Sequence, residues 1–297
     1  SCDKTPPAHL MAAGRFNIPT ILVICGYQPS GHYQGKHVDI EDVFIGSVQA
    51  MFGKLSKESL AGMCDHAITG PGVCAGMGTA NSMHIVCEAL GMTLPGAAPV
   101  LANSPKMFDL ARESGRRIVE MVWEDLTPRQ VLTPGAFRNA AASVLAVSGS
   151  INCVKHLQAT AVEAGVDVDL FSIFNELGER VPVLSAVAPN GADTIDAFEA
   201  AGAARGLLKQ LEPLLDLDAM TVTGRTLGEN LSGVIVHNSD VIRPLNRPFS
   251  RHASIVVLRG SLAPESAIVR PGLQRPGDNG HFEGTAIVYD DVPEAIS

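Results

Sequence analysis

The sequence predicts an α/β fold with a largely parallel sheet and flanking helices, followed by the start of a β-rich, barrel-like domain. The first observation is composition: aromatic residues make up only 5% while Ala and Gly are abundant, which is typical of close-packed α/β layers. The second is a pair of continuous apolar runs, 19–25 and 182–187, which read as strands buried on both faces. The third is a change after residue 217, where short β-like runs separated by Gly, Pro and Asn turns replace the helical patterns.

Length and charge restrict the class of protein. The 297 residues suffice for a large core, and 46% hydrophobic with 18% charged residues indicate a globular chain. A net charge of −9 without a basic stripe argues against a nucleic-acid partner. Apolar runs such as 18–25 are too short to span a membrane, and six cysteines in so long a chain favour a reduced, cytoplasmic setting. The chain has no initiator Met and begins at a reactive cluster, so we expect a fragment that lacks both ends.

The first elements follow from prolines, apolar runs and glycines. Residues 5–15 predict a short helix, because proline near a helix start removes an N–H group that would be unpaired anyway. The strand 19–25 comes next, and the polar, Gly-rich stretch 26–36 follows it as a loop. Ligands lie beyond the carboxyl ends of strands in parallel sheets, so this loop lies where a ligand would be expected. Two helices are then expected at 40–52 and 56–65.

A Gly-rich turn that carries Cys74 precedes the next helix. From Met77 onward apolar residues recur at helical spacing, so we expect a helix just after the turn. The N–H groups and dipole of that helix would favour a thiolate at Cys74. Two further helices are predicted where Ser104-Pro105 and Thr133-Pro134 each supply an N-cap followed by proline, and a Gly-broken helical stretch covers 194–215.

Cysteine, aspartate and lysine stand side by side at the start of the chain. Thiolates are the usual ligands of iron–sulfur clusters and zinc, but Cys2 and Cys74 lie 72 positions apart, so no local spacing pairs them. The carboxylate of Asp3 suits a hard cation such as Mg²⁺, while Lys4 by itself is a surface charge or an ion-pair partner. The remaining cysteines are interpreted as structural residues: Cys25, Cys64, Cys87 and Cys153.

Two long motifs carry a family resemblance. The run CDKTPPAHLMA at 2–12 resembles the signature of the dihydroxy-acid dehydratase and phosphogluconate dehydratase family, and PGVCAGMGTANSMH at 71–84 resembles its second motif. Supporting similarity extends in order over nearly the whole chain. The further segments that resemble the family are 89–100, 115–133, 221–231 and 259–270.

The resemblance implies a hydro-lyase that dehydrates a 2,3-dihydroxy acid to a 2-keto acid. It implies an iron–sulfur cluster, [2Fe-2S] or [4Fe-4S], held by three cysteines, of which Cys2 and Cys74 match two and the third would lie upstream. It also implies Mg²⁺ beside the cluster, with Asp3 and Lys4 matching ligands and the lysine open to carbamylation. The implied role is the dihydroxy-acid dehydratase step of branched-chain amino-acid biosynthesis. The implied partners are a small-molecule hydroxy-acid substrate and further copies of the chain, in a homodimer or higher homo-oligomer.

The predicted domains follow from the resemblance and from the change of sequence pattern after residue 217. Residues 1–230 are expected to form the α/β domain that binds the cluster and the metal, with its N-terminal part missing. Residues 231–297 are expected to begin a truncated β-rich C-terminal domain.

Departures from the family pattern leave alternatives open. The family's serine base belongs to a Gly-Pro-rich motif that this chain lacks, so no catalytic base is assigned. Residues 148–152 read SGSIN where the family has GGSTN, which favours the alternative of a sugar-acid (aldonate or phosphogluconate) dehydratase. His156 lies nearby and could face substrate, although a single histidine on a helix is more often structural. Two other readings are a non-catalytic fragment and a structural zinc protein that uses Cys2 and Cys74.

Overall fold

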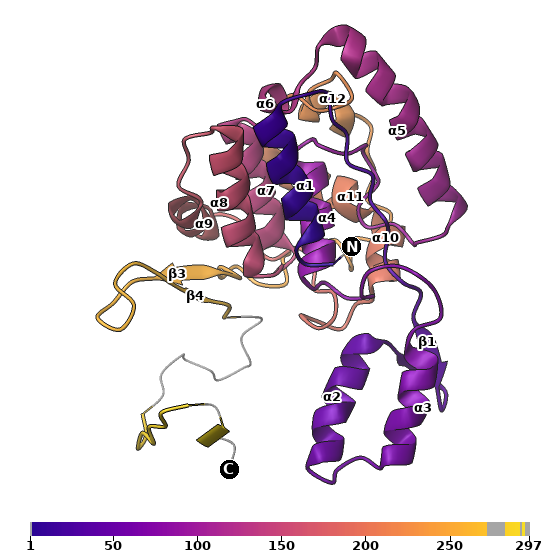
Figure 1. The fold of residues 1–297 in the computed structure, drawn as a ribbon, viewed down its shortest axis with the longest axis vertical. Helices are drawn as coiled ribbons and strands as arrows, with labels where there is room; N and C mark the ends of the chain where they lie inside the picture. The colour runs from indigo at the N-terminus through magenta and orange to yellow at the C-terminus, as the bar shows by residue number, and fades with distance from the viewer. Residues whose placement is uncertain (1, 272–282, 292, 295–297) are drawn as a thin grey trace.

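Helices dominate a mixed α/β structure (Figure 1). This computed structural model describes residues 2–271, 283–291 and 293–294. The helices are α1 Thr5–Phe16, α2 Ile40–Met51, α3 Lys57–Ala67, α4 Thr79–Ala89, α5 Pro105–Glu124, α6 Pro128–Val131, α7 Pro134–Ala146, α8 Asn152–Ala164, α9 Leu170–Gly178, α10 Ile195–Ala201, α11 Ala203–Leu211, the 3-10 turn η1 Glu212–Leu214 and α12 Leu227–Leu231. The strands are β1 Gly31–Tyr33, β2 Lys36–Val38, β3 Val256–Leu258 and β4 Ala267–Val269.

Local capping signals explain most helix starts. Ser104 and Thr133 accept hydrogen bonds from Met107 N and Ala136 N, and a proline opens each of the two helices, as the sequence predicts. The helices expected from 5, 40, 56 and 77 are confirmed as α1, α2, α3 and α4. The 194–215 stretch divides into α10 and α11 because Gly202, with φ of 133°, breaks the helix between them.

The core is built around α4 and α7. Every residue of α4 from Ala80 to Ala89 is buried, and α7 packs against both α4 and α9. Helix α1 lies along α8, where Gly14 faces Ala164 so closely that a Cβ at position 14 would lie 2.9 Å from the Ala164 Cβ. The small residues at this crossing let the C-terminal end of α1 pack closely on the C-terminal end of α8.

The predicted parallel sheet is not confirmed among the described residues. The regular pairing there consists of two antiparallel hairpins, β1–β2 and β3–β4. Parallel pairing near the expected strand 19–25 is limited to isolated bridges from Tyr27 to Val73 and to Leu101. The second expected strand, 182–187, makes one antiparallel bridge, Val183 to Ser250, and one parallel bridge from its last residue. Both apolar runs are thus extended segments without the regular ladder that defines a strand.

The β-rich domain expected after residue 230 is represented by the β3–β4 hairpin, and no barrel forms in the described part of the chain. Within the 221–231 run the structure places the short helix α12, whose capping box joins Thr226 and Glu229, so the β-like reading of that run is wrong. Part of the remaining C-terminal sequence lies outside the described residues.

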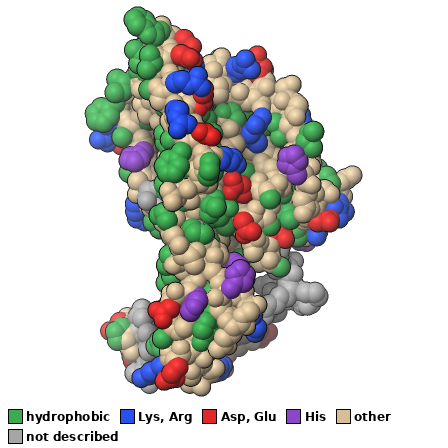
Figure 2. All heavy atoms as spheres, turned by 90° about the vertical axis from the view of Figure 1, so that its right-hand side faces the viewer, with side chains coloured by type: hydrophobic (Ala, Val, Ile, Leu, Met, Phe, Trp, Pro, Cys, Tyr) green, Lys and Arg blue, Asp and Glu red, His purple; other side chains and the backbone are tan. Residues whose placement is uncertain are grey.

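Residues 31–67 form a small lobe below the main body. Helices α2 and α3 pack on each other and α3 packs on the β1–β2 hairpin, so the lobe is held mainly by its own contacts (Figures 1 and 2). On the face drawn in Figure 2, Lys and Arg side chains are interspersed with Asp and Glu and form no basic stripe. No helix in the described residues is both long and apolar enough to cross a membrane.

Candidate functional site

The first predicted site segment directly precedes α1. The Cys2 carbonyl accepts a hydrogen bond from Thr5 N at 3.1 Å, and Lys4 takes the N-cap position of α1. The Cys2 and Lys4 side chains are exposed, whereas Asp3 is half-buried. Because Thr5 is already helical, the orientation of α1 determines where these three side chains lie.

The second predicted segment is the turn before α4, and its shape depends on glycine and asparagine. The Asn81 amide donates to the carbonyls of Cys74 and Gly76, both at 2.8 Å, and ties the turn to the first turn of α4. Gly72 adopts φ of 133°, and a Cβ there would lie 2.3 Å from Gln28 N. Only glycine fits that position, so Cys74 is held in a fixed, half-buried turn.

The two predicted cluster cysteines interact electrostatically. Burial raises the pKa of the Cys74 thiol, and the charges of Cys2, Glu41 and Asp39 raise this pKa further. The influence of Cys2 places the two thiols in one neighbourhood although they are distant in sequence. The helix N-terminus was expected to favour a Cys74 thiolate, but burial and the neighbouring charges shift the pKa of this thiol upward instead.

Asp3 is the centre of a polar contact between α1 and α8. Its Oδ2 accepts from Lys4 Nζ, and its Oδ1 lies 2.8 Å from His156 Nε2. The hydrogen bond from Lys4 lowers the pKa of Asp3 most, and the one from His156 lowers it further. Asp3 is therefore an anion at neutral pH with both oxygens directed by partners.

The sequence favoured a structural role for His156 over a role at the site. This histidine comes from α8, 153 residues after Asp3, and no local pattern links the two. The packing of α1 along α8 brings the two residues together. The nearest signal in the sequence was the position of His156 just after the unusual 148–152 stretch.

The 148–152 stretch docks on the N-terminal turn of α4. The Thr79 hydroxyl lies 2.8 Å from the Ser150 hydroxyl and accepts from the Asn152 amide at 3.1 Å. The Ser82 hydroxyl accepts from Ser150 N at 3.0 Å. Ser148 has φ of 48°, and its buried hydroxyl has no partner in the described residues. This network places several hydroxyl and amide groups next to the Cys74 turn.

The other cysteines differ in their surroundings. Cys87 and Cys153 are fully buried, and burial raises the pKa of Cys87 to about 12 and that of Cys153 further still. A thiol so strongly protonated is a core residue, as the sequence analysis expected. Cys25 is half-buried and Cys64 is exposed on α3.

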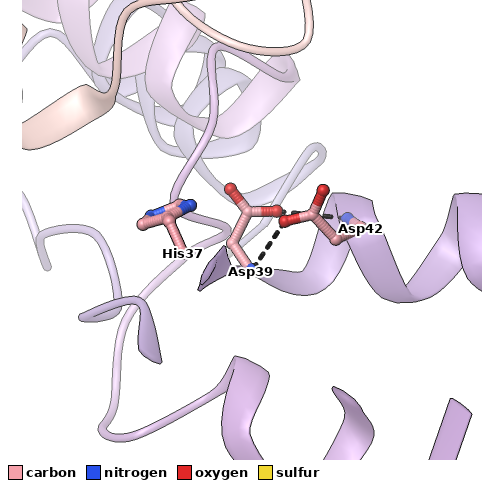
Figure 3. A group of neighbouring side chains, drawn as sticks. All are labelled: His37, Asp39 and Asp42. Carbon is pink, nitrogen blue, oxygen red and sulfur yellow. Dashed lines mark hydrogen bonds between the residues drawn. The ribbon is translucent and has the colours of Figure 1, made fainter. Parts of the chain in front are cut away.

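A third group of possible metal ligands lies at the start of α2, which sequence reasoning did not single out. The ligand atoms of His37, Asp39 and Asp42 lie within 4.8 Å of one another (Figure 3). The two aspartates already form a capping box, since Asp42 N donates to Asp39 Oδ1 at 3.3 Å and Asp39 N donates to Asp42 Oδ2 at 3.0 Å. Their arrangement is explained by helix initiation.

Comparisons with known proteins cover the entire chain. The family model described as dihydroxy-acid/6-phosphogluconate dehydratase N-terminal matches residues 1–230, and its C-terminal counterpart matches 240–297. Proteins named dihydroxy-acid dehydratase from Moorella thermoacetica and Caldanaerobacter subterraneus subsp. tengcongensis are each 42% identical over 100% of this chain. One from Methanococcoides burtonii is 41% identical. The chain spans about half the length of the curated relatives it matches, 53–54% of these three.

Proposed function

The chain belongs to the dihydroxy-acid and 6-phosphogluconate dehydratase family, and from this premise we propose that it contributes the cluster- and metal-binding part of a hydro-lyase. The proposed reaction converts a 2,3-dihydroxy acid to a 2-keto acid, as in branched-chain amino-acid biosynthesis. Two observations support the proposal: Asp3 contacts His156, 153 residues away in the chain, and the charge of Cys2 affects the pKa of Cys74.

We assign Cys2 and Cys74 as ligands of an iron–sulfur cluster. Neither forms a disulfide, and each thiol lies in the electrostatic range of the other. The raised pKa of Cys74 is compatible with this role, because a bound metal deprotonates a thiol that the metal-free protein keeps neutral. When bound, the cluster supplies a Lewis acid for the departing hydroxyl, and Mg²⁺ supplies charge stabilisation for the developing enolate.

Asp3 and Lys4 are assigned to the Mg²⁺ side of the site. Lys4 Nζ donates to Asp3 Oδ2 and so occupies a carboxylate oxygen that a Mg²⁺ ion would use. If the neutral Lys4 amine bonded to the carbon of carbon dioxide and lost one N–H proton to solvent, the resulting carbamate would offer an anionic oxygen ligand and free Asp3 Oδ2. The Lys4 side chain is highly exposed, so carbon dioxide can reach its amine.

The chain's own residues orient these groups. His156 holds Asp3 Oδ1, which fixes the carboxylate relative to α8. Thr79, Ser150 and Asn152 present hydroxyl and amide groups that can hydrogen-bond substrate hydroxyls. The part of the chain that the structure describes assigns no general base, and we propose none.

The alternative substrate is a sugar acid. Residues 148–152 favour it, because their hydroxyl-rich network lies where substrate hydroxyls would be held. Comparing turnover of 2,3-dihydroxyisovalerate with pentonates and hexonates separates the two, and a preference for a sugar acid would exclude the branched-chain role. If the 297-residue chain alone turns over substrate, the reading as a non-catalytic fragment is excluded. The cytoplasmic setting and the homodimer or higher homo-oligomer remain parts of this proposal.

Anaerobic reconstitution with iron and sulfide tests the cluster assignment. We expect Cys2→Ser and Cys74→Ser each to lose most of the bound iron and acid-labile sulfide. Cys64→Ser is the matched control, because Cys64 is an exposed cysteine on α3 outside the site. Equal iron in all four proteins would refute the assignment, and stoichiometric zinc without sulfide would support the structural zinc reading instead.

A further inference from the structure

Two histidines face each other on the β1–β2 hairpin of the small lobe. The register pairs His32 directly with His37, and their rings make an edge-to-face contact with centroids 6.1 Å apart. Residues directly opposite on two antiparallel strands project to the same face, with Cβ atoms about 4.5–5.5 Å apart. Both histidines are exposed, so an ion can reach this face of the hairpin from solvent.

Asp39 lies on the same face, because side chains alternate along an extended chain. Val38 is buried on the opposite face, whereas Asp39 follows His37 by two positions and its backbone is still extended, with φ of −132° and ψ of −175°. At Asp39 the chain enters α2, whose first turn carries Asp42. The hairpin and the start of α2 therefore bring ligand atoms of His37, Asp39 and Asp42 within 4.8 Å of one another (Figure 3).

Helix initiation uses one oxygen of each aspartate and leaves the other. Asp39 Oδ1 accepts from Glu41 N at 2.8 Å and from Asp42 N, while Asp42 Oδ2 accepts from Asp39 N. Within the described residues, Asp39 Oδ2 and Asp42 Oδ1 receive no hydrogen bond. Figure 3 shows the second oxygen of Asp39 on the side toward His37. Asp39 is only 4% exposed, and a buried carboxylate with an unpaired oxygen is stabilised by a cation beside it.

The donor set matches zinc better than a hard cation. Imidazole nitrogen and carboxylate oxygen both bind Zn²⁺, at about 2.0–2.2 Å, and four such ligands complete a tetrahedral site. Mg²⁺ and Ca²⁺ are bound mainly by oxygen ligands instead. Three ligand side chains are already gathered, and rotation of the exposed His32 side chain can supply the fourth. The two aspartates also give the site negative charge, which attracts a cation.

The lobe cluster consists of His32, His37, Asp39 and Asp42. We propose that the lobe cluster binds one Zn²⁺ ion, which joins the β1–β2 hairpin to the start of α2. The ion stabilises the small lobe, because these ligands come together only in the folded chain. None of the residues assigned to the iron–sulfur cluster or to Mg²⁺ contributes a ligand. The inference therefore holds or fails independently of the proposed dehydratase reaction.

Zinc binding to the untagged 297-residue protein tests the inference. The protein is stripped with EDTA under reducing conditions, and Zn²⁺ is added in competition with a chromophoric chelator to count the tightly bound ions. We expect His37→Ala to bind one Zn²⁺ ion fewer than the wild type, or to bind it at least tenfold more weakly. Zinc held by Cys2 and Cys74 would remain in His37→Ala, so a loss in this variant belongs to the lobe cluster.

A second variant removes a ligand without removing the helix cap. Asparagine caps helices as well as aspartate, so Asp39→Asn keeps the start of α2 but loses the carboxylate and should also weaken Zn²⁺ binding at least tenfold. His252→Ala and Asp65→Asn are the matched controls, because both side chains are exposed and neither belongs to the lobe cluster. Circular dichroism verifies that all four variants fold.

Hydrogen exchange locates the bound ion. Zn²⁺ should slow exchange of amides within residues 31–42 at least tenfold in the wild type and should leave them unchanged in His37→Ala. The inference is overturned if the wild type and His37→Ala bind Zn²⁺ equally, if Asp39→Asn binds it as tightly as Asp65→Asn, or if Zn²⁺ slows exchange only outside residues 31–42. It is also overturned if Mg²⁺ at the same concentration displaces Zn²⁺, which would show an oxygen-only site.

Discussion

Replacing Gly14 with alanine tests the close contact between the C-terminal ends of α1 and α8. A Cβ at position 14 would lie 2.9 Å from the Ala164 Cβ and 3.0 Å from the Ala164 Cα and N. Two of these three atoms are backbone, so no change of side-chain rotamer relieves the overlap. Overpacking of this kind costs about 1–3 kcal/mol. Alanine in a helix interior gains about 1 kcal/mol over glycine.

We therefore expect Gly14→Ala to lower the free energy of unfolding by up to about 2 kcal/mol. Gly115→Ala on α5 is the matched control, because nothing lies within 4 Å of its added Cβ, and it should raise the same quantity by about 1 kcal/mol. Urea unfolding followed by circular dichroism at 222 nm measures both. If Gly14→Ala stabilises as much as Gly115→Ala, α1 and α8 are not in the close contact described here.

Three further predictions concern stability. Burial raises the pKa of Glu88 to about 7 from 4.5, so the stability that its protonated form adds to the fold is full below pH 4.5 and is lost as pH rises through 7. Between pH 5 and pH 8 the free energy of unfolding of the wild type should fall by up to about 3 kcal/mol more than that of Glu88→Gln, as measured by urea unfolding. An equal fall in both proteins would contradict this. Arg117 Nε donates to the Val222 carbonyl at 2.7 Å, and Arg117→Met leaves this carbonyl without a donor. The substitution should lower the free energy of unfolding in urea by about 2 kcal/mol. Arg116 is exposed, so Arg116→Met should change this free energy little. Ser104→Ala removes the N-cap of α5 and should cost about 1 kcal/mol by thermal unfolding, with Ser104→Asp retaining stability; a neutral Ser104→Ala would show that the cap is not needed.

Features encoded locally could be predicted from the sequence. Ser104-Pro105 and Thr133-Pro134 determine helix starts through groups three residues apart, so the pattern alone suffices. The same holds for Gly72 in the Cys74 turn, whose backbone conformation few other residues adopt.

Features that need distant partners could not be predicted in this way. The apolar run 19–25 has the sequence of a strand, but a strand exists only when a neighbouring segment pairs with it. Within this run the backbone pairing consists of the hydrogen bond from Leu22 N to Met92 O, so no regular ladder forms among the described residues. The contact between Asp3 and His156 depends on how α1 crosses α8, which no local pattern encodes. The site assignments for Cys2, Asp3, Lys4 and Cys74 came from the family resemblance, because their spacing in the sequence does not link them.

The small lobe of residues 31–67 has a consequence for how the protein responds to proteases. Its helices α2 and α3 pack mainly on each other, so the lobe can open while the α4–α7 core stays folded. The connection between the two helices carries Lys54 and ends at Lys57, both exposed and accessible to trypsin. Limited digestion should therefore cut first in this connection, and the two resulting fragments should stay associated through the contact between α2 and α3.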